Sequence, residues 1–390
     1  MYSSHNMSAI TLAIFLVLHA AAAAPNPPSQ QPLHDVDVGK VDDPPKWSSL
    51  PIRLTDLGPT INITIGNPPQ TIPVNLDISS PNCWIIPTTL DKPPCPVSGR
   101  GLNTSLSESY LPTPMRANFT NGWIWGAGNM AFDMVGYGSL PAPFQSFIVA
   151  SEIGGGGGGS NACPMAGFVG LAPDEGRNTS ILGKPSHFER MVELGTLEKD
   201  LIALRLWQPA ELSLGRVNKD LYWGDWLAEV PLTRGSGTWQ TTASHLVLGS
   251  SSGKHSDELR FELDDEPATF STTQPWITVP EAVYEGLATA LGFESKTWLG
   301  PPTVDCCRRK TMPNITLNLA GQDITLTPYH YTEFLDGLAP PDDPQCMSLI
   351  YPPYYRVKHP NRVVLGTAFL RFFYTVFDWE DGMVRFAELW

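Results

Sequence analysis

From Pro51 onward, short apolar runs alternate with turn-forming residues along the chain. The runs are rich in Val, Ile, Leu and Thr, and Gly, Pro and Asn separate them. Runs of this length and composition are typical of β-strands joined by turns. Helices are expected at a few places, over Ser186 to Leu194 and over Pro280 to Leu291. The pattern therefore predicts an all-β fold with a few short helices.

Two segments repeat one design, in which an apolar strand enters a hydroxyl-rich turn and then returns to apolar chain. Asp77 lies in the turn of the first segment, and Ser271 holds the corresponding position in the second. Each segment is followed by a second apolar strand that ends in glycine, at Gly170 and Gly366 respectively. Because the separation between turn and glycine is nearly the same in both cases, the spacing indicates an internal duplication.

These paired segments resemble those of the pepsin-like aspartic peptidases, whose two lobes each contribute an Asp-containing turn and a later strand beneath it. Further matches lie at Ile63 to Gln70, Trp239 to Thr242 and Phe372 to Asp378. The resemblance implies a bilobal pepsin-like fold with a deep cleft between two related lobes. It places an N-terminal lobe at residues 51–207 and a C-terminal lobe at residues 208–390.

In the resembled family, two neighbouring carboxylates share one proton, so that one activates water and the other hydrogen-bonds the substrate carbonyl. The resemblance assigns the retained catalytic carboxylate to Asp77 and places Ser271 at the position of the missing Asp. A serine hydroxyl carries no charge near neutrality. Losing one member of a catalytic unit typically costs about 5 kcal/mol or more of transition-state stabilisation. Ordinary proteolysis is therefore not expected.

The resemblance reveals two further departures at the same site. Ile78 and Ser79 stand where the family has Thr and Gly, and the Ile78 side chain cannot form a hydrogen bond. The segment from Trp123 to Gly128 resembles the hairpin that closes over the substrate, with Trp125 in place of a tyrosine. The residues expected to line the binding site are Ser79, Trp125, Gly126, Thr272 and Thr273.

Three departures at one site favour a homologue that is impaired or inactive as an endopeptidase. Such a protein would keep the inter-lobe cleft for binding a peptide or a small-molecule ligand. One alternative is a repurposed enzyme that uses Asp77 as a lone acid or base on a small molecule. Another is a weak acid endopeptidase in which a water molecule substitutes for the missing carboxylate. None of these hypotheses requires a cofactor or a metal ion.

Two other assignments of the second half-site are disfavoured. A shifted match would give its role to Asp264 or Asp265, but the spacing to Trp276 and Pro280 argues against the shift. A Ser-His-Asp arrangement built on Ser271 needs a neighbouring histidine. The candidates lie in unrelated segments, at His245, His255, His330 and His359.

The beginning of the chain predicts export. Residues 10–24 form an apolar stretch that ends in small residues, which indicates a signal peptide over residues 1–24. Residues 25–50 are rich in Pro, Asp and Gln and are expected to form a linker. No later run has the length of a membrane span, so a secreted protein, or one held in the lumen of the secretory pathway, is expected. Possible glycan acceptors lie at Asn62, Asn103, Asn118, Asn178 and Asn314.

Six cysteines in an exported chain favour disulfides over metal binding or nucleophilic roles. By the family resemblance, Cys346 pairs with Cys306 or Cys307. In the first lobe the pairing stays open among Cys83, Cys95 and Cys163, and the sequence does not decide whether the odd member joins the spare of Cys306 and Cys307.

Composition narrows the choice of partners. The 390 residues carry a formal net charge of −14, which argues against nucleic acid as a partner. Hydrophobic residues make up 42% of the chain, enough for one large or two medium cores. A monomer with neither a nucleic-acid partner nor a membrane span is expected.

Overall fold

The structure is a computed structural model. It describes residues 43–55, 58–90, 101–121, 124–155, 166–175, 185–249, 258–294, 301–335, 344–353 and 362–389. Pro44–Trp390 forms one compact unit. The predicted signal peptide, Cys95, Cys163 and Asn178 lie outside the described residues. Within the described ranges, no helix is both long and apolar enough to cross a membrane.

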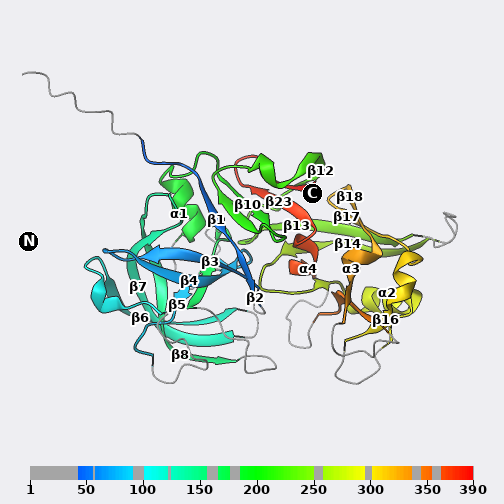
Figure 1. Cartoon of the computed structure of the whole chain (residues 1–390), viewed down its shortest axis with the longest axis horizontal. Coiled ribbons are helices and arrows are strands. Elements are labelled where there is room, and N and C mark those ends of the chain that lie inside the picture. The colour runs from blue at the N-terminus through cyan, green and yellow to red at the C-terminus, as the bar shows by residue number, and fades with distance from the viewer. Residues whose placement is uncertain are drawn as a thin grey trace, which may run out of the picture. The chain divides into compact units, whose positions relative to one another are not determined.

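The strands of the described residues form four sheets, and the two largest are marked in Figure 1 by the labels β3, β4 and β7 and by β13, β14 and β17. The eight-stranded sheet has the order β2 (Arg53–Thr55), β3 (Gly58–Ile65), β4 (Gln70–Asp77), β9 (Gly167–Gly170), β5 (Trp84–Ile85), β8 (Phe144–Gly155), β7 (Ile124–Gly136) and β6 (Leu111–Asn121). The seven-stranded sheet has the order β18 (Gln322–Leu326), β17 (Ile315–Leu319), β13 (Gln240–Leu248), β14 (Leu259–Phe270), β22 (Val363–Leu365), β15 (Ile277–Thr278) and β21 (Ile350–Tyr351).

Two smaller sheets and several short helices complete the described fold. The six-stranded sheet has the order β1 (Ser48–Pro51), β11 (Glu211–Leu214), β10 (Leu201–Arg205), β23 (Phe373–Asp378), β24 (Met383–Glu388) and β12 (Trp223–Pro231). The three-stranded sheet has the order β16 (Thr303–Asp305), β20 (Gln345–Ser348) and β19 (Thr332–Phe334). The α-helices are α1 (His187–Glu193), α2 (Glu281–Leu291), α3 (Pro328–Tyr331) and α4 (Thr367–Leu370), and the 3₁₀-helices are η1 (Thr104–Leu106), η2 (Lys219–Leu221) and η4 (Cys306–Lys310).

The two largest sheets repeat one local topology. In the first, β4 is parallel to β9, β9 is antiparallel to β5, and β5 is parallel to β8. In the second, β14 is parallel to β22, β22 is antiparallel to β15, and β15 is parallel to β21. The strand pairing therefore carries the duplication that the spacing indicates. It places Asp77 at the end of β4 and Ser271 directly after the end of β14.

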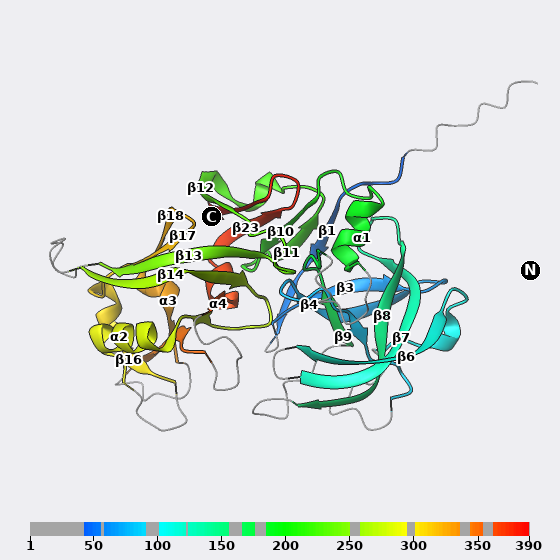
Figure 2. The ribbon, with the colours of Figure 1, turned by 180° about the vertical axis from the view of Figure 1, so that it is seen from behind.

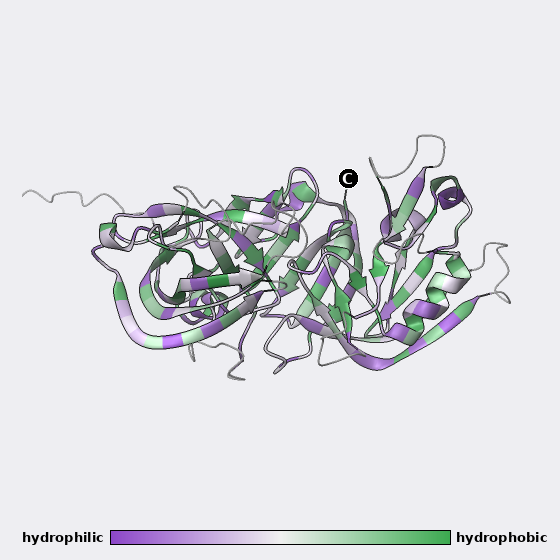
Figure 3. Ribbon diagram, turned by 90° about the horizontal axis from the view of Figure 1, so that it is seen from below, coloured by the Kyte–Doolittle hydropathy of each residue, from purple (hydrophilic) through white to green (hydrophobic). Residues whose placement is uncertain are grey.

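The six-stranded sheet joins strands from both halves of the chain. Strand β10 pairs with β23, so that Leu201 lies opposite Asp378, and Figure 2 shows β1, β10, β11 and β23 close together. Apolar residues alternate with polar ones along many strands in Figure 3, as expected for sheets with one buried face. Trp239 is fully buried, and its indole N–H donates to the Leu171 carbonyl over 3.1 Å. The core thus continues beneath both turns.

The predicted all-β fold with two related lobes and a few short helices is confirmed. Helix α1 begins after Ser186, whose hydroxyl accepts from the Glu189 N–H in a capping box, and α2 ends at Gly292 with a left-handed backbone. One boundary differs, because β1 begins at Ser48, inside the segment predicted as a linker. Leu50 is buried there and lies opposite Leu212 of β11, and this burial orders the strand.

Candidate active site

Asp77 is the last residue of β4, and the turn after it folds closely over β9. Asp77 lies opposite Gly170 in the parallel pair. A Cβ added to Gly170 would lie 2.3 Å from the Ser80 carbonyl oxygen, so only glycine allows this approach. Gly366 does the same in the second half, where an added Cβ would lie 2.3 Å from the Trp276 carbonyl oxygen. Both turns therefore rest on equivalent glycines.

The Asp77 carboxylate is 1% exposed and is surrounded by hydrogen-bond donors. Its Oδ1 accepts from the Ser79 N–H over 2.8 Å and from the Ser79 hydroxyl over 2.6 Å. Its Oδ2 accepts from the Asn121 side-chain amide. Burial raises the pKa of the Asp77 carboxyl, while the hydrogen bonds from Ser79, Asn121 and the Ser80 backbone act in the opposite direction. Protonated Asp77 is thus favoured relative to a carboxyl in water.

Ser271 occupies the equivalent turn and receives equivalent backbone donors. The N–H groups of Thr273 and Gln274 point at Ser271 Oγ over 3.3 and 3.2 Å. Ser271 Oγ also lies 3.2 Å from the Thr273 hydroxyl. The side chain is 2% exposed. The turn therefore keeps the amide donors that would hold a carboxylate, but they converge on a neutral hydroxyl.

Ser79 connects the two turns. The Ser271 hydroxyl donates to Ser79 Oγ over 3.2 Å, and the Ser79 hydroxyl donates in turn to Asp77 Oδ1. The Thr238 hydroxyl donates to the Ser79 carbonyl over 3.2 Å. Both hydroxyl protons in this chain point toward Asp77, so the chain stabilises its negative charge. The structure therefore brings together Asp77, Ser79, Ser271 and Thr273.

Thr272 links the two turns a second time, beneath the carboxylate. Its hydroxyl donates to the Leu76 carbonyl over 2.6 Å and accepts from the Ile78 N–H over 3.1 Å. Thr272 and Ile78 are both buried. The Ile78 side chain holds the equivalent position in the first turn and has no group that could return these bonds. The second turn therefore bonds to the first through the Thr272 side chain, and the Ile78 side chain returns no equivalent bond.

Asn121 is the site residue that the sequence did not reveal. Its amide lies between two residues of the first half, because Nδ2 donates to Asp77 Oδ2 and Oδ1 accepts from the Trp84 indole N–H over 2.6 Å. Asn121 ends β6, where Phe119, two residues earlier, is also buried. A polar residue at an inward position of an otherwise alternating strand was the available signal.

Comparison with known proteins fits this geometry. Residues 60–389 match the family model described as eukaryotic aspartyl protease. The chain belongs to this aspartyl protease family. It is 25% identical over 336 residues to vacuolar protease A of Arthroderma otae, covering 84% of this chain and 77% of the relative. It is 27% identical over 336 residues to gastricsin of Oryctolagus cuniculus, covering 84% and 80%. It is 28% identical over 376 residues to cathepsin D of Dictyostelium discoideum, covering 88% and 89%.

The hairpin of β6 and β7 in this aspartyl protease homologue carries Trp125 and Gly126, both predicted to line the binding site. Trp125 is 56% exposed, lies opposite Thr120, and packs its ring over Gly154. Gly126 is buried instead, and a Cβ added there would clash with the Phe119 ring. Since neighbouring residues of a strand face opposite sides, Trp125 points away from the face that carries Asn121. Among the described residues, Asn121 and not Trp125 is the hairpin side chain that contacts Asp77.

The alternative acid residues lie outside this site. Asp264 and Asp265 are exposed residues within β14, with left-handed backbones at φ of 51° and 55°. His245 bonds to Ser244, and His330 stacks on Phe372; His255 and His359 lie outside the described residues. Within the described part of the chain, no cluster of three or more His, Cys, Asp or Glu residues could hold a metal ion.

The cysteines and glycan acceptors are distributed around the site. Cys306 pairs with Cys346, while Cys307 is a free, exposed thiol and Cys83 a free, buried one. Burial raises the pKa of the Cys83 thiol, so this cysteine is inert toward oxidants in the folded state. The sequons within the described ranges have exposed asparagines at Asn62, Asn118 and Asn314 and a half-buried one at Asn103.

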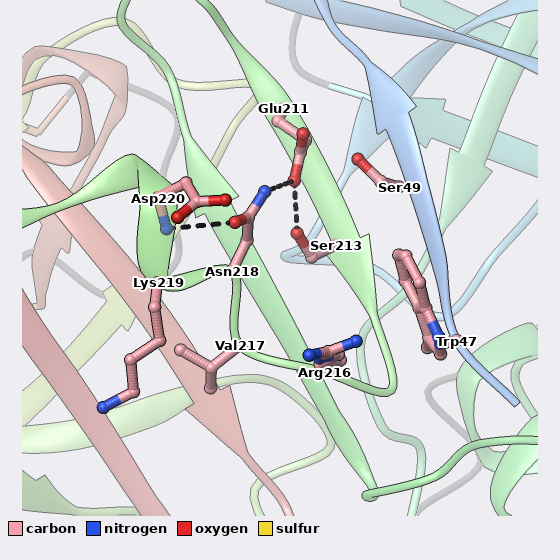
Figure 4. A pocket seen from close by; sticks show the side chains of 9 residues that line it. All are labelled: Trp47, Ser49, Glu211, Ser213, Arg216, Val217, Asn218, Lys219 and Asp220. Carbon is pink, nitrogen blue, oxygen red and sulfur yellow. Dashed lines mark hydrogen bonds between the residues drawn. The ribbon is translucent and has the colours of Figure 1, made fainter.

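A separate pocket lies on the six-stranded sheet (Figure 4). It measures about 300 Å³ and lies between β1 and the segment that follows β11. Glu211 accepts hydrogen bonds from Ser213 and Asn218, and the Arg216 guanidinium lies 5.1 Å from the centre of the Trp47 ring. Neither Asp77 nor Ser271 lines this pocket, so it is distinct from the candidate active site.

Proposed function

We propose that this aspartyl protease homologue is impaired as an endopeptidase and uses its inter-lobe cleft to bind a peptide or small-molecule ligand. The observation that carries the proposal is the neutral Ser271 in the turn equivalent to that of Asp77. Peptide hydrolysis in this family needs one ionised and one protonated carboxyl group at the two turns. Ser271 takes the place of the second carboxyl group, so Asp77 titrates alone.

The surroundings of Asp77 support the proposal. A lone carboxylate can activate water, but the partner that polarises the scissile carbonyl is absent, and a catalytic pair acts as a unit. The Asn121 amide also donates a hydrogen bond to Asp77 Oδ2, the carboxylate oxygen that accepts no hydrogen bond from Ser79. Water activation at that oxygen would require the amide to move.

A second candidate is acid or base chemistry by Asp77 on a small molecule. Burial raises the Asp77 pKa, and a raised carboxyl pKa suits a general acid. A weak acid endopeptidase is the third candidate, and the experiment below decides it.

The proposal includes location and organisation. Several relatives carry the name vacuolar protease A, a name that places those proteins in the vacuole, a compartment of the secretory pathway. We infer that this chain also enters the secretory pathway, with a lobe at residues 51–207, a second at residues 208–390, and a monomeric state.

The test compares four forms of the purified chain on a diverse quenched-peptide library from about pH 3 to pH 6. They are the natural sequence, Asp77→Asn, Ser271→Asp and the double variant that combines the two substitutions. The natural sequence and Asp77→Asn should show no cleavage above background. Ser271→Asp should raise cleavage by about 100-fold or more, because the Thr273 and Gln274 N–H groups are already placed to donate to a carboxylate. The double variant Asp77→Asn with Ser271→Asp should lose the gain.

Two outcomes contradict the proposal. Cleavage by the natural sequence that disappears in Asp77→Asn would show a working endopeptidase. A folded but inactive Ser271→Asp would show that Ser271 is not the cause of impairment. Thermal melting of all forms establishes that each is folded.

A further inference from the structure

Asn121 contacts the oxygen of Asp77 that does not bond to Ser79, in the way that a polar group of a ligand would. Its Nδ2 donates to Asp77 Oδ2, and its Oδ1 accepts from the Trp84 indole N–H over 2.6 Å. Asn121 is 5% exposed, and Trp84 and Asp77 are buried on either side. A single carboxamide therefore satisfies one acceptor and one donor that would otherwise be buried without partners.

We propose that Asp77 Oδ2 and the Trp84 indole form a recognition site for a primary carboxamide, and that Asn121 is its internal occupant. The ligand class is a peptide with an asparagine or glutamine side chain, whose amide replaces that of Asn121. This inference rests on the proposed binding role of the Asp77 site, and it adds the chemistry that the site selects.

The donor and acceptor pattern selects this class. A ligand carboxylate would place an acceptor against the Asp77 carboxylate, which repels it unless a proton is shared. An ammonium group has no acceptor for the Trp84 N–H, and an aliphatic side chain would leave both groups unsatisfied. A primary carboxamide presents a donor and an acceptor side by side, as Asn121 does.

The other polar groups of the site do not change this selection. Asp77 Oδ1 is engaged by the Ser79 N–H and hydroxyl, and the Ser271 hydroxyl donates to Ser79. Oδ2 is thus the carboxylate oxygen that faces the hairpin. The Trp84 ring is fixed by stacking on Phe119, with ring centres 4.4 Å apart, so its N–H keeps one direction.

Internal occupancy lowers the apparent affinity for a ligand. The ligand binds only the fraction of molecules in which Asn121 has left, so its apparent dissociation constant rises by the inverse of that fraction. Removing the Asn121 carboxamide should therefore tighten binding of a peptide that supplies its own.

The experiment uses the full chain and four variants at position 121 or beside it. Asn121→Ala vacates the site, and Asn121→Ser is a second vacating variant that keeps a small polar group. Asn121→Leu fills the site with an apolar group of similar size. Thr120→Ser is the matched control, because Thr120 is exposed on the other face of the same strand and serine keeps the possible glycan acceptor at Asn118.

The probes are N-acetylated pentapeptides with a C-terminal methylamide that differ only in the central residue, which is Asn, Gln, Asp or Leu. Calorimetry gives the affinity, and the Trp84 indole proton resonance, assigned by its loss in Trp84→Phe, gives the location. Asn121→Ala and Asn121→Ser should bind the Asn or Gln peptide about tenfold or more tighter than the natural sequence. The same variants should bind the Asp and Leu peptides at least about tenfold more weakly than they bind the Asn and Gln peptides. Thr120→Ser should match the natural sequence, and Asn121→Leu should not bind.

The inference is overturned if neither vacating variant tightens binding, or if the Leu peptide binds as well as the Asn and Gln peptides. This result is separable from the proposed function, because cleavage by Ser271→Asp is measured with Asn121 in place. If the natural sequence cleaves no peptide and the vacating variants show no selectivity for the carboxamide peptides, only this inference is removed. An active natural enzyme would remove the proposed function and leave the selectivity measurement standing.

Discussion

The two turns of the candidate active site have kept opposite halves of one design. The first turn retains the carboxylate of Asp77 but has Ile78 where a hydroxyl would link it to the other lobe. The second turn retains that hydroxyl in Thr272 but has Ser271 where a carboxylate would stand. Each turn keeps its glycine-backed strand and its backbone donors. The difference lies in two side chains on a common frame.

The comparison separates the requirements of folding from those of catalysis. Thr272 satisfies a buried carbonyl and a buried N–H of the first turn, and losing both bonds would destabilise the fold. A second carboxylate serves only the chemistry, because two neighbouring carboxylates repel each other and one must take up a proton. Thr272 therefore contributes to the stability of the fold, whereas a carboxylate at position 271 would contribute only to the chemistry.

The largest effect on stability is expected from Thr272→Val. Valine fills the same volume but leaves the Ile78 N–H and the Leu76 carbonyl buried without partners. The free energy of unfolding should fall by about 3 kcal/mol, measured by urea denaturation. Thr273→Val is the control, since Thr273 is half-buried and its hydroxyl lies 3.2 Å from Ser271 Oγ without bonding to the first turn in the described residues. It should change stability by about 0.5 kcal/mol or less. Equal effects of the two substitutions would show that the link between the turns carries no special weight.

The next largest effect on the free energy of unfolding is expected from the titration of the Asp77 carboxyl group. Its pKa is raised in the folded state by burial, so the folded protein binds the proton more tightly than the unfolded chain. The contribution of Asp77 to stability should therefore be fully present at low pH and should be lost as the pH rises from the ordinary Asp value through the raised one. Each unit of upward shift contributes about 1.4 kcal/mol. Urea melts from pH 3 to pH 7 measure this loss.

Asp77→Asn is the reference for this pH dependence, because subtracting its curve removes the contribution of the other acidic groups. The difference should show a single step in the natural sequence. Ser271→Asp should show two coupled steps, as for two carboxyl groups in one site. A difference curve that is flat with pH would contradict the burial of an ionisable Asp77.

The sequence was sufficient to predict those features of the fold and the site that depend on neighbouring residues. The strand-to-turn design exposes Asp77 and Ser271, and the Ser186 cap and the Gly292 end fix α1 and α2, because neighbouring residues decide these features. Asn121 and Asp77 are 44 residues apart, and their contact depends on how the hairpin folds back across the sheet. The spacing of residues along the chain therefore does not predict the contact between Asn121 and Asp77. The choice of Cys306 over Cys307 likewise depends on the backbone direction at the start of η4.

The smallest effect offers the sharpest test of the symmetry between the turns. If the frame of the first turn still matches that of the second, a hydroxyl at position 78 should find partners like those of Thr272. Ile78→Thr and Ile78→Val remove nearly the same apolar volume, so their difference isolates the hydroxyl. We expect Ile78→Thr to be more stable than Ile78→Val by about 1 kcal/mol, the net value of a typical buried hydrogen bond. If the hydroxyl finds no partner, its burial should make Ile78→Thr the less stable of the two by about 1–3 kcal/mol, and urea denaturation of the pair distinguishes the two signs.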